Sequence, residues 1–123
     1  MKKYVPGQSV GDLEDWPFDN PDSNYVIERG APRASGRVDD GGAGHMTRTG
    51  IWRCTAGAVS CTELSDELMT VLEGRCTLTD HGTGQSVDLG PGDTLFIKEG
   101  ARVTWDVHED LTKVFYGYRA AGF

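Results

Sequence analysis

Residues 86–97 read SVDLGPGDTLFI, and this stretch decides the fold class. Two short runs, Ser86–Leu89 and Thr94–Ile97, flank the turn sequence Gly90-Pro91-Gly92-Asp93. Glycine supplies a positive φ cheaply, and proline presets φ at the first position of many turns. The stretch therefore predicts two strands that are separated by a tight turn.

The same pattern extends over the second half of the chain, where helical periodicity is hard to find. Such regular spacing of short strands and turns is typical of an antiparallel β-sandwich or barrel. A shorter strand is expected earlier, at 25–27. The further strands expected are 51–54, 59–64, 68–72, 76–79, 102–107 and 113–118, with turns at 56–57, 73–74, 80–84 and 99–100.

The first fifty residues have a different character. Residues 1–24 are rich in Pro, Asp, Asn and Gly, which predicts an extended N-terminal arm ahead of a β-barrel domain at 25–123. Trp16 and Phe18 in this arm need apolar cover, either along the barrel or against a second subunit. Residues 30–50 are rich in glycine and are expected to form a surface loop.

Composition excludes several classes of partner. The 123 residues carry a net charge of −7, so nucleic acid is not an expected partner. No apolar run approaches the ~20 residues that span a bilayer, so no membrane span is expected. The N-terminus has no apolar signal-peptide core, and three cysteines without a CxxC argue against a disulfide framework. Together these features predict a cytoplasmic protein with reduced thiols.

Two segments resemble the paired motifs of the cupin superfamily. Glu67 followed by Gly74 is similar to the end of the first motif, and Gly90–Asp93 followed by Gly100 is similar to the second. More narrowly, residues 50–118 resemble small single-domain cupins grouped with (S)-ureidoglycine aminohydrolase. The strings that carry this likeness are Gly50–Thr55, Asp66–Leu68, Leu72–Arg75, Leu89–Asp93 and Thr104–Glu109. The resemblance implies an all-β, single-domain cupin (a jelly-roll barrel, or double-stranded β-helix), a pocket between its sheets, and a homodimer that shares N-terminal strands.

The resemblance also locates the positions that hold a metal in metal-binding cupins. Three histidines and one glutamate are usual there, and these positions fall here on Cys61, Glu63, Glu67 and Val103. A metal is therefore not expected. If one were bound, Glu63, Glu67 and Cys61 would be its ligands and manganese or zinc the ion, although this mixture of donors suits no ion well.

Strand alternation places Cys61 and Glu63 on one face, within reach of Glu67 if that face points inward. Two neighbouring carboxylates raise the pKa of one of them, so Glu63 and Glu67 are candidates for a metal-free acid/base pair. Two other interpretations stay open: Glu63 lies in solvent at a strand end, or Glu67 bonds to the backbone or to Arg53.

Further candidates for ligand binding follow from the same alternation. Trp105 shares its strand face with Val103, and is either a platform for a flat ligand or a core residue. Met69 and Tyr116 are expected in an apolar lining, and the planar guanidinium of Arg53 suits a carboxylate or ureido group.

Three functional hypotheses remain. The first is a cupin that binds a small molecule without classical metal chemistry. The second is a metal-dependent, aminohydrolase-like enzyme acting on a small ureido or amino acid. The third is a non-catalytic structural or interaction module that uses its N-terminal arm to join subunits.

Overall fold

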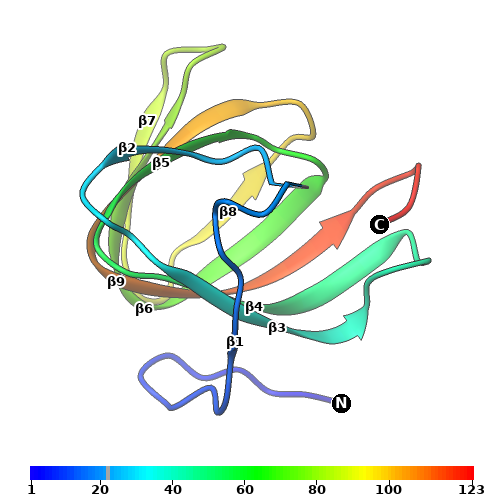
Figure 1. Ribbon diagram of the computed structural model, residues 1–123. Helices are drawn as coiled ribbons and strands as arrows, with labels where there is room; N and C mark the ends of the chain where they lie inside the picture. The colour runs from blue at the N-terminus through cyan, green and yellow to red at the C-terminus, as the bar shows by residue number, and fades with distance from the viewer. Residues whose placement is uncertain (22) are drawn as a thin grey trace.

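The computed structural model describes residues 1–21 and 23–123, and these form one curled antiparallel sheet (Figure 1). The expectation of an all-β, single-domain fold is confirmed. No helix long and apolar enough to cross a membrane occurs among the described residues. The strands in that part of the chain are β1 (Glu14–Asp15), β2 (Val26–Arg29), β3 (Ala34–Gly41), β4 (Thr47–Cys54), β5 (Gly57–Thr62), β6 (Asp66–Asp80), β7 (Ser86–Leu89), β8 (Thr94–Ile97) and β9 (Arg102–Tyr118).

Strand β9 organises the sheet because it pairs with three others, namely β4, β5 and β6. The order β1-β3-β4-β9-β5-β2 runs through it, and β6 also pairs with β7 and β8. The strands expected at 86–89 and 94–97 are confirmed with those bounds. The resulting half-barrel turns one face of β4, β5, β6 and β9 toward its interior (Figure 1).

Strands β6 and β9 are longer than the sequence predicted. The turn expected at 73–74 is wrong, since Gly74 is a bulge inside β6, where the register against β9 shifts. Gly74 has φ of +85°, and a Cβ there would lie 2.1 Å from the carbonyl oxygen of Asp110. A bulge bends the strand without ending it, so one strand bends where two were expected.

The surface loop expected at 30–50 is also wrong over most of its length. Strands β3 and β4 occupy it and pair from Ala34↔Cys54 to Gly41↔Arg48. Backbone hydrogen bonds and a half-buried face outweigh the low strand propensity of its glycines. Gly36 is needed here because the Trp16 ring packs where its Cβ would be.

The N-terminal arm lies along its own sheet. β1 pairs with β3, and the Trp16 amide donates to the carbonyl of Ala34 at 3.0 Å. Trp16 and Phe18 both pack against the core cluster, so they gain their apolar cover within this chain. Near its start, the arm is held where the Tyr4 hydroxyl donates to Asp39 at 2.6 Å.

The core fills the concave side of the sheet. Val103, Trp105 and Val107 alternate along β9 and are each about 1% exposed. The shared face of Val103 and Trp105 is therefore confirmed. All three cysteines, Cys54, Cys61 and Cys76, are buried and free.

Candidate functional site

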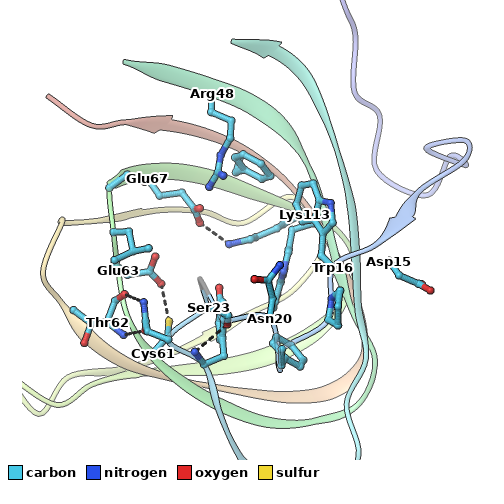
Figure 2. A pocket seen from close by; sticks show the side chains of 18 residues that line it. Asp15, Trp16, Asn20, Ser23, Arg48, Cys61, Thr62, Glu63, Glu67 and Lys113 are labelled. Atoms are coloured by element: carbon cyan, nitrogen blue, oxygen red, sulfur yellow. Dashed lines mark hydrogen bonds and ion pairs between the residues drawn. The ribbon is translucent and has the colours of Figure 1, made fainter. Parts of the chain in front are cut away.

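A cavity of about 320 Å³ lies between the inner face of the half-barrel and the arm (Figure 2). The arm contributes Trp16, Phe18 and Tyr25 to its wall, and the sheet contributes Trp52 and Phe115. Aromatic rings therefore surround a space in which charged side chains from four segments also meet. These are Arg48, Glu63, Glu67 and Lys113.

Lys113 and Glu67 form a buried ion pair in this cavity. The Lys113 ammonium donates to a Glu67 carboxylate oxygen at 2.5 Å, and the two side chains are only 6% and 10% exposed. The ammonium nitrogen also lies 4.2 Å from the centre of the Trp105 ring and 4.9 Å from that of Trp52. Among the described residues, Glu67 therefore pairs with Lys113 and not with Arg53 or the backbone, contrary to one interpretation of the sequence.

Sequence reasoning missed Lys113, although a signal was present. Lys113 lies on β9 between Leu111 and Phe115, and all three side chains alternate onto the same face of the strand. Leu111 and Phe115 face inward and are 0% and 3% exposed. A lysine at an inward position of a strand needs a buried acid, because an unpaired charge is costly there. Glu67 was the available acid.

Glu63 follows the end of β5 and turns its carboxylate into the cavity and not into solvent. One of its oxygens accepts from the Trp105 indole at 3.4 Å and from the Cys61 thiol at 3.6 Å. Burial raises the pKa of Glu63, and the charge of Glu67 raises it further against the opposing effect of Lys113. Glu63 therefore holds a proton more readily than an exposed glutamate does.

The cavity does not fit a metal well. Within the described chain, no group of three or more His, Cys, Asp or Glu side chains is placed to hold an ion. The Glu67 carboxylate already bonds to Lys113. Burial, and then the carboxylate of Glu63, raise the pKa of Cys61 well above its usual range, so a metal would have to displace the thiol proton in order to bind this sulfur.

Arg48 on β4 is the second functional residue that the sequence did not reveal. Its guanidinium carbon lies 4.5 Å from the centre of the Phe123 ring and 5.3 Å from that of Phe115. Its Nε is buried and has no hydrogen-bond partner among the described residues. Burial lowers the pKa of Arg48, while the nearby Glu67 carboxylate opposes this change. No signal marked Arg48, because its segment was expected to be a loop.

The other residues that the sequence singled out as candidates for ligand binding do not line this cavity. Arg53 follows Trp52 on β4, so its side chain points to the opposite face of the strand. It donates to the Thr112 hydroxyl at 2.8 Å and pairs with Glu73 and Asp110 outside this cavity. Tyr116 alternates with Phe115, so it faces outward and is 48% exposed.

Met69 and Val103 are core residues at 1% exposure, and Trp105 packs against the Lys113 ammonium and supports the ion pair. Of the predicted set, Cys61, Glu63 and Glu67 line the cavity.

The sequence matches a known family over more than half its length, with residues 41–115 aligning to the EutQ-like cupin domain. The chain belongs to this family. This EutQ-like cupin has no match among curated proteins. The cupin resemblance seen in the sequence is thereby confirmed at the level of the superfamily.

Solved structures agree on the fold. The EutQ protein of Clostridium difficile has a TM-score of 0.62 at 16% identity, with 73% of this chain and 71% of that chain covered. A protein of unknown function of the DUF861 family from Pseudomonas syringae pv. tomato has a TM-score of 0.73 at 23% identity, over 88% of this chain and 45% of that one. A Rhizobium leguminosarum protein of unknown function scores 0.61 at 20% identity, over 96% of both chains. Identities this low establish a common fold and leave function to the site itself.

Proposed function

We propose that this EutQ-like cupin binds a small organic molecule in the cavity between its sheet and its N-terminal arm. The observation that carries the proposal is the buried Lys113–Glu67 pair, which faces the cavity beside the protonatable Glu63. Ligand sites are concave, mostly apolar and supplied with a few convergent polar groups, and their volumes begin near roughly 300 Å³. A cavity of about 320 Å³ suits a metabolite of modest size.

Folding alone does not call for this arrangement. A buried ion pair is often no better for stability than apolar residues of the same volume, because both charges lose their hydration. Acids with a perturbed pKa, such as Glu63, also cluster at functional sites, where binding and catalysis need tuned acids and bases. The pair at Lys113 and the acid at Glu63 therefore support a role in recognising a ligand.

A second candidate is metal-free acid/base chemistry on the bound molecule. Glu63, with its raised pKa, is suited to donate a proton, and Glu67 lies beside it. The narrower likeness to (S)-ureidoglycine aminohydrolase makes ureido and amino acids the first substrates to try. Ammonia release by the unmodified protein, lost in Glu63→Gln, would support this candidate. Equal release by both proteins would remove Glu63 from any such reaction.

The third hypothesis, an interaction module, receives less support. A barrel filled with its own side chains would favour such a module, whereas this half-barrel keeps an open cavity with charged groups. The homodimer implied by the cupin resemblance stays a prediction, and it is compatible with either function.

The binding proposal is tested by a thermal-shift screen of small metabolites on two matched variants. Ser23 lines the cavity and Ser9 does not, yet each accepts a hydrogen bond from the amide two residues ahead. Ser23→Trp should abolish the melting-temperature increase produced by any compound that binds the unmodified protein. Ser9→Trp should preserve it. Retention of the increase in Ser23→Trp, or no binder in the screen, would refute the proposal.

A further inference from the structure

We infer that the ligand of this cavity is a small monocarboxylate with a flat apolar body, whose negative group pairs with Arg48. This inference rests on the proposed binding function and goes beyond it by naming the chemical class. It starts from the guanidinium that the aromatic rings of Phe115 and Phe123 hold in place.

The guanidinium of Arg48 is positioned but not paired. Its described contacts are ring faces, and its buried Nε lacks a hydrogen-bond partner in the described structure. A guanidinium presents its N–H groups as a planar fork, which matches the two oxygens of a carboxylate. Figure 2 shows Arg48, Lys113 and Glu67 pointing into one space, so an anion at Arg48 would lie inside the cavity.

The charges of the side chains that line the cavity favour a ligand with a single negative group. Lys113 and Glu67 neutralise each other at 2.5 Å, and Glu63 tends to keep its proton. Asp15, at the rim, is exposed and points away (Figure 2). With Glu63 protonated, Arg48 carries the one uncompensated charge among the described side chains that face this space. A chain of net charge −7 thus has a cavity that favours a monoanion.

The aromatic part of the cavity wall indicates the shape and polarity of the uncharged part of the ligand. Trp16, Phe18, Tyr25 and Trp52 surround the space with ring surface. Tyr25 and Trp52 are close to parallel, with ring centres 6.5 Å apart and planes at 16°. Aromatic walls favour a flat apolar body, because offset stacking and burial of apolar area both stabilise it.

Isothermal titration with benzoate and benzamide tests the inference, because the two compounds have nearly the same shape and differ in charge. Benzoate should bind the intact chain about 10- to 100-fold more tightly, as expected for hydrogen bonds to a charged group. Arg48→Met should remove this preference and Arg48→Lys should keep part of it. Arg33→Met, which removes the same charge at an exposed residue outside the cavity, should leave the preference unchanged.

The outcomes separate this inference from the proposed function. Benzamide binding as tightly as benzoate, with Ser23→Trp blocking both, would overturn the carboxylate class and leave small-molecule binding intact. A benzoate preference that survives in Arg48→Met would also overturn the inference. Absence of binding by both compounds and by every other compound screened would overturn the inference and the proposed function together.

Discussion

Each charge of the buried ion pair between Lys113 and Glu67 depends on the other for compensation, because the two side chains are only 6% and 10% exposed and both have lost most of their contact with water.

The buried pair yields a prediction on stability. Lys113→Met or Glu67→Met alone should lower the free energy of unfolding by about 3–5 kcal/mol, since each leaves an unpaired buried charge. The double variant should lose much less than the sum of the two. Urea denaturation measures all three. The control is the pair of Lys98 and Asp66 at 3.3 Å, whose lysine is exposed, so Lys98→Met should cost far less than either change at the buried pair. Additive losses at Lys113 and Glu67 would contradict the pairing.

Glu63 yields a prediction on pH. Burial raises its pKa above the usual 4.5 in the folded state, so the folded chain binds the proton more tightly than the unfolded chain. The stability that this proton contributes is complete below the unfolded pKa and is lost as pH rises through the folded pKa. Glu63→Gln should therefore be more stable than the unmodified protein at about pH 8, because glutamine places no charge in the buried cavity.

Urea denaturation across the pH range checks this. The gain in the free energy of unfolding of Glu63→Gln should vanish toward about pH 4, where the protonated glutamate and the glutamine that replaces it are both neutral. Exposed Glu109→Gln serves as the control and should show little difference at any pH. A Glu63→Gln difference that stays constant with pH would contradict a raised pKa at Glu63.

At the scale of elements, strands were predicted better than their ends. β7 and β8 matched because turn chemistry bounds them on both sides. β9 was divided in two where the exposed polar residues 108–110 interrupt its pattern. β6 was divided in two because a glycine in a bulge and a glycine in a turn look the same in a sequence. What separates them is the partner strand, and for Gly74 that partner is β9 at Asp110.

Gly74 and Gly92 provide a matched test of this difference. Both have positive φ, at +85° and +90°, but a Cβ at Gly92 would meet no atom within 4 Å. Gly92→Ala should cost only the conformational strain, on the order of 1–2 kcal/mol. Gly74→Ala should cost clearly more, because β6 and β9 must also separate at Asp110. Equal losses in thermal denaturation would contradict the tight bulge.

At the scale of the whole molecule, the arm and the half-barrel make the cavity together. Neither encloses it alone, since Trp16, Phe18 and Tyr25 form one wall and the strands form the other. The fold class could be predicted because turn spacing and the cupin motifs agree. The enclosed site could be predicted only in part. Strand alternation and the cupin resemblance brought Cys61, Glu63 and Glu67 together. Arg48 was missed because its segment becomes a strand only by pairing with β3 and with the distant β9.

Chemical-shift mapping by NMR, with the tightest-binding compound of the thermal-shift screen, tests whether the cavity between the sheet and the arm is the binding site. We predict that the largest changes fall on the backbone amides of Cys61 to Glu67, on the indole of Trp52 and on Lys113, and that Ser23→Trp abolishes them. Changes confined to the outer face, around Leu68, Phe96 and Tyr116, would contradict it.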